Sequence, residues 1–297
     1  MLLTIAIPVY NGEKTISRCL QSAINQDTKE EYQILVVNNA STDNTLNLIN
    51  GYKEKVENLT VVANPKTVTM CENHNICINH SKTEFILFLH ADDYLLPTAV
   101  ESICTKIRSR NYPENYILWG RSLYNDYSTR YGYDNIFVSN SEVLDCFIQG
   151  GLTPSGTTYS KKLLDSFGGF PELKHRAPAF DWALLLLSVF SANIFYEQAN
   201  TFFFIRTYSS IGGKNTRLDD YECHKEALDY CIERLSQQER IVLVRCIYEK
   251  NSLLSDYISS IFPSIKSDHR KKISLKKIIK YILPFGLVRF IQMYKSR

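Results

Sequence analysis

The chain has 297 residues, 44% of them hydrophobic and 22% charged, which is the composition of a globular protein and excludes wholesale disorder. That length is enough for one large domain, or for one domain and an appendage. The formal charge of +3 hides an asymmetry: residues 266–297 hold ten Lys and Arg against one acid, a net charge of +9, and the rest of the chain carries −6.

Several common features are missing from the sequence. Met1 is followed by apolar residues without a basic region, so we expect no secretory signal. The longest uncharged apolar-rich run, residues 183–196, is fourteen residues long, whereas a membrane-spanning helix needs about 20. The eight cysteines have neither CxxC nor zinc-binding spacing, so we expect reduced thiols. Neither GxGxxG nor GxxxxGKS occurs, so a dinucleotide fingerprint or a P-loop is excluded.

The first hundred residues alternate between buried strands and helices. Leu2–Val9 is an almost continuous apolar run, typical of a strand that is buried on both faces, and a helical apolar spacing follows from Ile16 to Ile24. A second strand is expected at Tyr32–Val37, and Ser41 or Thr42 can cap a helix that runs through Ile49. Further strands are expected at 59–63 and 85–89, and Pro97 then starts a helix. This order predicts an α/β fold with a mostly parallel central sheet and flanking helices.

The second half of the sequence is less regular. We expect strands at 116–120 and 201–205, a short helix from Ser141, a loop at 150–156, a turn at 168–171 and a helix at 181–191. After Gly212-Gly213 only helices are expected, at about 219–235 and 237–260. The chain therefore divides into a main domain at 1–215, a helical extension at 216–265 and a basic tail at 266–297.

Three polar clusters follow expected strands, at residues 10–13, 38–43 and 90–93. In open parallel sheets ligands bind beyond the carboxyl ends of the strands, so these clusters predict the ligand-binding edge. The last cluster contains Asp92 and Asp93, whose oxygens suit Mg²⁺ or Mn²⁺, and His90 adds an imidazole that is more acceptable to Mn²⁺. The alternative is that both aspartates turn the chain and cap the next helix.

These motifs resemble those of family 2 glycosyltransferases. The resemblance rests on the order and spacing of four segments: Thr4–Lys14, Ile34–Thr45, Asn73-His74-Asn75 and His90-Ala91-Asp92-Asp93. A weaker likeness at Pro154-Ser155 and Gly168-Gly169-Phe170 extends it to about residue 210. The family has the GT-A fold and moves a sugar from a nucleotide-sugar to an acceptor with inversion.

The resemblance implies a donor site at the ends of the first strands. Pro8, Tyr10, Asn11 and Glu13 would line the nucleotide pocket, with Asn75 and Ala91 beside it, and Asp92, Asp93 and His90 would hold Mn²⁺ or Mg²⁺. Three positions depart from the usual family residues. Asn38, expected at the base, replaces an aspartate, and His90 replaces the first aspartate of the metal motif. His74 replaces an arginine, so neutralisation of the diphosphate would be weaker or pH dependent. For Asn38 and Asp43, turn formation and helix capping are the alternative roles.

The family's general base corresponds to Asp181, at the start of a helix after the Gly-Gly-Phe turn. Such a base removes the proton of the acceptor hydroxyl; the alternative is a structural helix cap. Trp182 either stacks on a sugar or packs in the core, and His175 and Arg176 either contact phosphate or lie in a solvated loop. Arg206 resembles a late family arginine near the diphosphate.

The tail is read independently of the resemblance. Apolar residues at helical spacing from Leu275 to Leu283 are opposed by five lysines, and a second stripe follows Pro284. A basic amphipathic helix is typical of an anionic membrane surface; packing onto the chain's own acidic body is the alternative, and no motif supports nucleic acid.

Together these features predict a cytoplasmic enzyme, peripheral to the inner face of the membrane, that uses a nucleotide-sugar, preferably a UDP-sugar. The expected acceptor is a glycan, lipid-linked, as in bacterial surface polysaccharides. A non-catalytic binding protein on the same fold is the main alternative, motivated by Asn38, His74 and His90. A nucleotidyltransferase is disfavoured because no Gly-rich, Lys-bearing loop lies near the amino terminus.

Overall fold

A computed structural model describes residues 1–122, 135–136, 143, 155–173, 179–191, 195–205, 217–250, 257–258 and 260. The chain forms two compact units. The first contains Met1–Ile136, Leu152–Glu172 and Phe195–Asn215, and the second contains Phe137–Gly151, Leu173–Ile194 and Thr216–Arg297. The boundaries expected at residues 215 and 265 stay a prediction.

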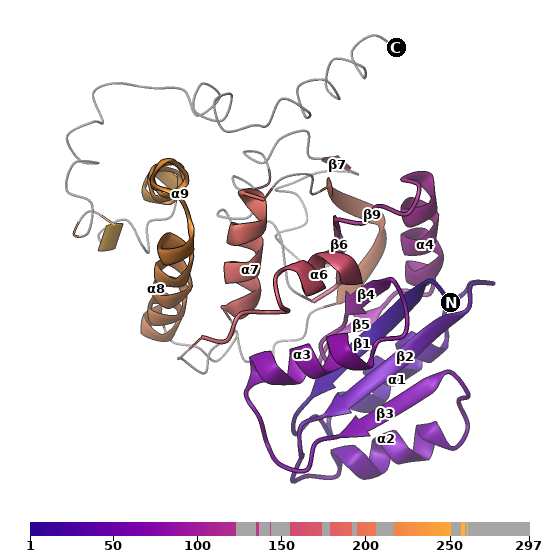
Figure 1. Cartoon of the computed structure of the whole chain (residues 1–297). Coiled ribbons are helices and arrows are strands. Elements are labelled where there is room, and N and C mark those ends of the chain that lie inside the picture. The colour runs from indigo at the N-terminus through magenta and orange to yellow at the C-terminus, as the bar shows by residue number, and fades with distance from the viewer. Residues whose placement is uncertain are drawn as a thin grey trace. The chain divides into compact units, whose positions relative to one another are not determined.

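The described strands of the first unit form one mixed sheet in the order β3-β2-β1-β4-β8-β6-β9-β5, with β7 paired to β9 (Figure 1). Their bounds are β1 Leu3–Val9, β2 Tyr32–Asn38, β3 Leu59–Ala63, β4 Phe85–Phe88, β5 Tyr94–Leu95, β6 Tyr116–Ser122, β7 Asn135–Ile136, β8 Thr157–Ser160 and β9 Phe195–Ile205. The expected strands are confirmed, and β9 begins earlier than predicted. The first four strands are parallel, whereas β8 pairs antiparallel with both β4 and β6.

The central strands are buried along their whole length, as their apolar runs predicted. Every residue of β1 and β2 is buried. Pro8 is tolerated in β1 because the pairing with β4 has already ended at Ala6 and Phe88, so its missing N–H interrupts no ladder on that side. Beyond that point β1 continues in register with β2, and Val9 pairs with Asn38.

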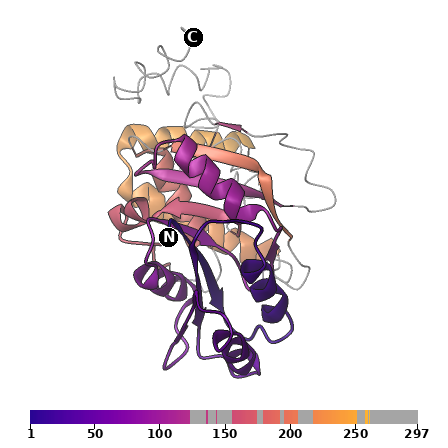
Figure 2. The same cartoon turned by 90° about the vertical axis from the view of Figure 1, so that its right-hand side faces the viewer.

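Helices cover both faces of this sheet. Those of the first unit are α1 Ile16–Ile24, α2 Thr45–Lys53, α3 Met70–His80, α4 Ala99–Ser109 and α6 Lys161–Ser166. The main core joins alternate residues of β1, β2 and β4 to the apolar faces of α1, α2 and α4. Helix α3 packs against β1 and β2, and its buried residues lie outside that core, so it covers the opposite face. Figure 2 shows the same elements after a 90° turn.

Local signals explain where two of these helices begin. At α3, Thr69 accepts a hydrogen bond from the backbone N–H of Glu72 at 3.0 Å, a capping pattern readable in the sequence. At α2 the expected cap was wrong: Asp43, not Ser41 or Thr42, accepts the backbone N–H of Thr45 at 3.0 Å. The expectation that Pro97 starts the next helix was wrong by two residues: α4 begins at Ala99, and Pro97 lies in the turn before it.

The second unit contains α7 Phe180–Val189, α8 Arg217–Arg234 and α9 Gln237–Lys250. Helix α7 is apolar nearly all round and almost fully buried, as expected for a core helix. The thiol of Cys231 on α8 donates to the carbonyl of Ala183 at 3.5 Å, and the rings of Trp182 and His224 meet edge to face at 5.1 Å. Trp182 is 8% exposed, which confirms its packing in the core.

Two further expectations concern the whole chain. The seven described cysteines are free and buried, in agreement with the expected thiols. Within the described residues, no helix combines the length and the apolar character needed to cross a bilayer. The helix expected from Ser141 and the basic tail lie outside the described residues.

The Gly168-Gly169 turn provides a test of the packing. Both glycines have positive φ, +74° and +87°, which costs a residue with a Cβ about 1 kcal/mol or more. A Cβ on Gly169 would also lie 2.6 Å from Oδ1 of Asn75, whereas a Cβ on Gly168 meets no described atom within 4 Å. We expect Gly168→Ala to lower the free energy of unfolding by about 1 kcal/mol and Gly169→Ala by about 2–4 kcal/mol, measured by urea denaturation. If both variants lose the same unfolding free energy, the Asn75 side chain moves away from the new Cβ without a measurable loss of stability.

Candidate functional site

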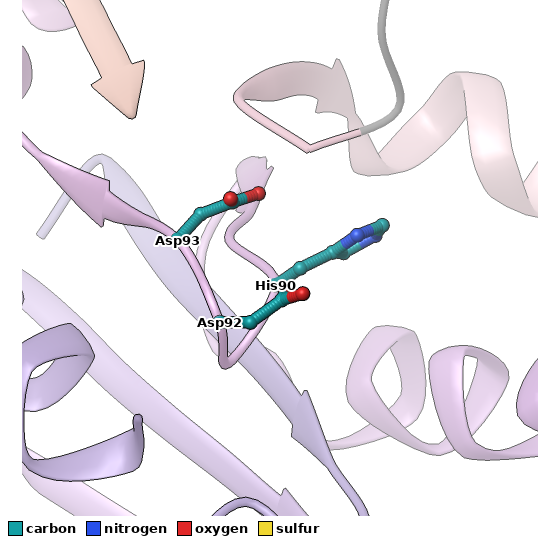
Figure 3. A group of neighbouring side chains, drawn as sticks. All are labelled: His90, Asp92 and Asp93. Atoms are coloured by element: carbon teal, nitrogen blue, oxygen red, sulfur yellow. The ribbon is translucent and has the colours of Figure 1, made fainter. Parts of the chain in front are cut away.

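The metal-binding candidates lie in the turn between β4 and β5, residues 90–93, which we call the metal turn. One ligand atom from each of His90, Asp92 and Asp93 lies within 4.8 Å of the others. Figure 3 shows the three side chains projecting to the same side of the turn. Asp93 is 3% exposed, and the other two are half-buried. Two carboxylates and an imidazole fit Mn²⁺ well and Mg²⁺ through their oxygens. The donor set is consistent with a metal site, and the assignment of these residues as metal ligands stays a prediction.

Neighbouring elements hold the backbone of this turn. The N–H of Asp93 donates to the carbonyl of His90 at 2.9 Å, and the N–H of His90 donates to Oγ of Ser155 at 3.1 Å. On the other side, the guanidinium of Arg18 donates to the carbonyl of Asp92 at 3.4 Å and lies 4.4 Å from the ring centroid of Tyr94. Sequence reasoning missed Ser155 and Arg18 as supports, because no local pattern predicts contacts over such separations.

His74 is buried beside the turn and is uncharged. Burial, then the nearby His90, lowers the pKa of His74 to about 3, against the opposing effect of its hydrogen bond to Met70. Its Nδ1 lies 2.8 Å from the carbonyl oxygen of Met70, so Nδ1 carries the proton of the neutral ring. Of the two alternatives stated for His74, a weaker neutralisation of a diphosphate agrees with this lowered pKa, whereas a ring that gains charge near physiological pH does not.

The first two loops of the candidate donor site bind each other. Asn11 has φ +50°; its N–H donates to Oγ of Ser41 at 2.9 Å, and its Oδ1 accepts the N–H of Thr42 at 2.8 Å. Glu13 accepts the N–H of Asn44 at 3.1 Å. Asn11 and Glu13 thus hold the loop after β1 against the loop after β2. Their predicted contact with a donor stays a prediction.

Asp43 also joins the two loops. We call the hydrogen bonds of Asn11, Glu13 and Asp43 between the loop after β1 and the loop after β2 the interloop clasp. Besides the N–H of Thr45, its carboxylate accepts the N–H of Glu13 at 3.1 Å. Burial raises the pKa of Asp43, but these hydrogen bonds and one from the hydroxyl of Thr45 outweigh it and hold the pKa below its usual value. The turn-and-cap role expected for Asp43 is confirmed, and its bond to the other loop is new.

Asn38 ends β2 inside a network of buried amides. It is 1% exposed, and its Oδ1 accepts no hydrogen bond from any residue that the structure describes. Next to it, Nδ2 of Asn64 donates to Oδ1 of Asn39 at 3.1 Å and to Oδ1 of Asn73 at 2.9 Å. The carbonyl of Asn38 accepts the backbone N–H of Asn64 at 2.9 Å, which holds its backbone, and its amide oxygen keeps a free acceptor position.

The remaining donor candidates differ in their surroundings. Tyr10 is 52% exposed, and Pro8 is buried in β1. Ala91 packs at the edge of the main core, and a Cβ on Gly12 would lie 3.8 Å from it, so the metal turn adjoins the loop after β1. Asn75 uses both polar atoms of its amide on the backbone of Phe170, at 2.8 and 3.0 Å. This gives Asn75 a structural role, and its contact with a donor stays a prediction.

Asp181 lies in the first turn of α7, as the resemblance implied. It is 5% exposed, and its Oδ1 accepts the N–H of Trp182 at 2.7 Å. Burial raises its pKa to about 7, although backbone hydrogen bonds act in the opposite direction. A carboxyl group with this pKa exchanges a proton near neutral pH. His175, Arg176 and Arg206 lie outside the described residues.

Curated relatives match a limited stretch of the chain. It is 43% identical over 99 residues to a poly(ribitol-phosphate) beta-glucosyltransferase of Bacillus spizizenii, which is 32% of this chain and 15% of the relative. It is 31% identical over 96 residues to the poly(ribitol-phosphate) beta-N-acetylglucosaminyltransferase TarS of Staphylococcus aureus, 32% of this chain and 17% of that protein. These matches therefore span less than a fifth of either relative.

Solved structures resemble the whole fold. A crystal structure of S. aureus TarS residues 1–349 with UDP-GlcNAc has a TM-score of 0.66 at 20% identity and covers 93% of this chain and 77% of that one. The mannosyltransferase PcManGT of Pyrobaculum calidifontis, with GDP-Man and Mn²⁺, has a TM-score of 0.58 at 13% identity, covering 99% and 88%. These likenesses confirm the predicted GT-A fold. The family model described as "Glycosyl transferase family 2" matches residues 4–158, more than half of the chain. The chain therefore belongs to glycosyl transferase family 2.

Proposed function

We propose that the protein is an inverting glycosyltransferase that moves a sugar from a nucleotide-diphosphate sugar to a lipid-linked glycan in surface-polysaccharide biosynthesis. The observation that carries the proposal is the cluster of His90, Asp92 and Asp93 at the end of β4, in a chain of this family. The bound UDP-GlcNAc and GDP-Man of the two neighbours support a nucleotide-sugar donor. The poly(ribitol-phosphate) named for the two relatives supports a polymeric acceptor that carries hydroxyl groups.

The donor would bind over the ends of β1, β2 and β4, and a UDP-sugar is favoured. Tyr10 offers an exposed aromatic face for the nucleobase, and the free acceptor oxygen of Asn38 suits an N–H of a base such as uracil. Asn11 and Glu13 keep these two residues in place through the interloop clasp. Arg206 is proposed near the diphosphate from the resemblance alone.

The residues of the metal turn would hold Mn²⁺ or Mg²⁺. When bound, such a cation offsets charge that develops on the leaving diphosphate. The chain's own part is to present two carboxylates and one imidazole from a turn whose backbone is held by Ser155 and Arg18. Neutral His74 contributes no positive charge.

Asp181 is proposed as the general base. Its raised pKa places the carboxylate near the proton affinity that suits a base at neutral pH, and such a group contributes about 10²–10⁴-fold to the rate. Asp181 would take the proton of a hydroxyl group of the sugar acceptor as the oxygen of that group attacks the anomeric carbon of the donor.

The basic tail would keep the enzyme on the inner face of the cytoplasmic membrane, where a lipid-linked acceptor is available. Residues 266–297 carry +9, and each basic residue near an anionic surface contributes about 1 kcal/mol. In this proposal the tail attaches the protein to the membrane, and the residues that bind the donor lie in the first unit.

The metal proposal predicts the effect of Asp92→Ala. We expect UDP-GlcNAc with Mn²⁺ to raise the melting temperature of the wild-type protein, because a ligand that binds the folded state stabilises it. Asp92→Ala should lower donor turnover by about 10²-fold or more. Asp165→Ala, an exposed acid on α6, is the matched control and should leave turnover unchanged. If the donor binds and Asp92→Ala turns over normally, the metal assignment is wrong; binding without any turnover would favour a binding protein.

The raised pKa of Asp181 predicts opposite effects on activity and stability. Turnover should rise with pH through about 7 and then level off, since the ionised form is the base. Asp181→Asn should lower turnover by about 10²–10⁴-fold. Folding raises the pKa of Asp181, so the folded protein becomes less stable as the pH rises from the pKa of the unfolded state to that of the folded state. Asp181→Asn removes this loss and should therefore raise the melting temperature at pH 8. Glu233→Gln, on an exposed acid of α8, should change neither. Unchanged turnover in Asp181→Asn contradicts the base assignment.

The tail proposal is tested with lipid vesicles. Replacing Lys271, Lys272, Lys276, Lys277 and Lys280 with Gln should weaken sedimentation of the full chain with phosphatidylserine-containing vesicles by at least about tenfold. Neutral phosphatidylcholine vesicles are the control, and the wild-type binding should fall as salt is raised. Equal binding of the two proteins to the anionic vesicles would mean that the tail packs elsewhere.

A further inference from the structure

We propose that Asn75 is a positioning residue that fixes the imidazole of His90, acting through Phe170 and His74. This inference rests on the proposed function, because His90 acts there as a metal ligand. The four side chains lie in the first unit and come from α3, from the Gly168-Gly169 turn and from the metal turn.

The first link is the amide of Asn75 on the backbone of Phe170, 95 residues away. Its Nδ2 donates to the carbonyl of Phe170 at 3.0 Å, and the N–H of Phe170 donates to its Oδ1 at 2.8 Å. The thiol of Cys71, one helical turn earlier, donates to the same carbonyl at 3.3 Å. Because one amide satisfies both polar groups of Phe170, it fixes the backbone from which that ring projects.

The second link is the ring of Phe170. It is 4% exposed and meets the rings of Phe88 and His74 edge to face, with centroids 5.3 and 5.9 Å apart. The ring of His74 stacks on Phe88 at 5.5 Å, with 21° between the planes. His74 is therefore enclosed by two phenylalanines, and its Nδ1 is bonded to Met70.

The third link is the contact between the two imidazoles. The rings of His74 and His90 meet edge to face at 5.6 Å, with 88° between the planes. Ser155 holds the backbone of His90 but does not by that bond set the rotation of its ring. The fixed ring of His74 thus packs against the half-buried imidazole of His90 and sets its orientation.

This arrangement predicts an effect on one ligand of three. Asp92 and Asp93 lie in a turn whose backbone bonds do not involve Asn75. Loss of the Asn75 amide should therefore disturb the imidazole and leave the carboxylates in place. An imidazole matters more to Mn²⁺ than to Mg²⁺, so the loss should be selective for Mn²⁺.

The test measures binding of Mn²⁺ and of Mg²⁺, each alone, by calorimetry on the full chain. We expect Asn75→Ala to weaken Mn²⁺ binding by about tenfold and Mg²⁺ binding by no more than about twofold, as for the loss of a group that orients a metal ligand. His90→Ala should give the same selectivity, and the double variant should be no weaker than His90→Ala. Asn50→Ala, an exposed asparagine on α2, is the control. Equal losses for both metals, or losses that add in the double variant, would overturn the inference.

Two further measurements keep the test decisive. If Asn75→Ala does not fold, Phe170→Leu removes the ring edge while keeping the Asn75 bonds to the backbone, and the same selective loss is expected. Imidazole ¹⁵N–¹H spectra of the metal-free protein should show shifted His74 and His90 signals in either variant and an unchanged signal for exposed His80. If the wild-type protein binds neither cation, the proposed metal site is wrong, and the His90 signal alone decides the inference: an unchanged signal refutes it.

Discussion

The parallel pairing of β1 with both β2 and β4 determines where the chemistry of this chain lies. Parallel strands end at the same edge of a sheet, so the turns after these three strands meet there whatever their sequences. The pairing is itself favoured by burial, since every residue of β1 and β2 is buried and its backbone polar groups must bond to a neighbouring strand. A continuous apolar run in the sequence thus places Tyr10, Asn38 and Asp92 at one edge.

At that edge, several polar side chains form hydrogen bonds with the backbone of the protein. Asp43 and Glu13 use their carboxylates on backbone N–H groups of the facing loop, and Asn75 uses its amide on Phe170. Each of these bonds, including those of the exposed Glu13, holds the loops of the candidate site in place. Preorganisation of this kind is what a site needs in order to act on charge that develops during a reaction.

The sequence sufficed to predict β1, β2, β3, β4, β6 and the end of β9, the helical face from Ile16 to Ile24 and the polar turn at 90–93, because local periodicity and strand ends determine them. It missed β5 and β7, which are two residues long, and β8, whose residues Thr157–Ser160 form no apolar run. It could not predict the roles of Asn75 or Ser155, whose partners lie 95 and 65 residues away. It could not decide between the two alternatives for His74 for the same reason: the pKa of this residue depends on burial among Phe88, Phe170 and His90, which no local pattern reveals. The cap of α2 was assigned first to Ser41 or Thr42, and capping by Asp43 was only an alternative, because its bonds to two loops at once follow no local pattern.

The neutral ring of His74 has a consequence for how the ligands of the proposed enzyme assemble. With no cation at His74, the proposed metal, together with the proposed Arg206, would compensate the charge of a diphosphate at this edge. Donor and metal would then bind cooperatively, and by thermodynamic reciprocity each would raise the affinity for the other by the same factor. Such a protein responds to the product of two concentrations, so that a shortage of either the cation or the activated sugar is enough to leave the site empty.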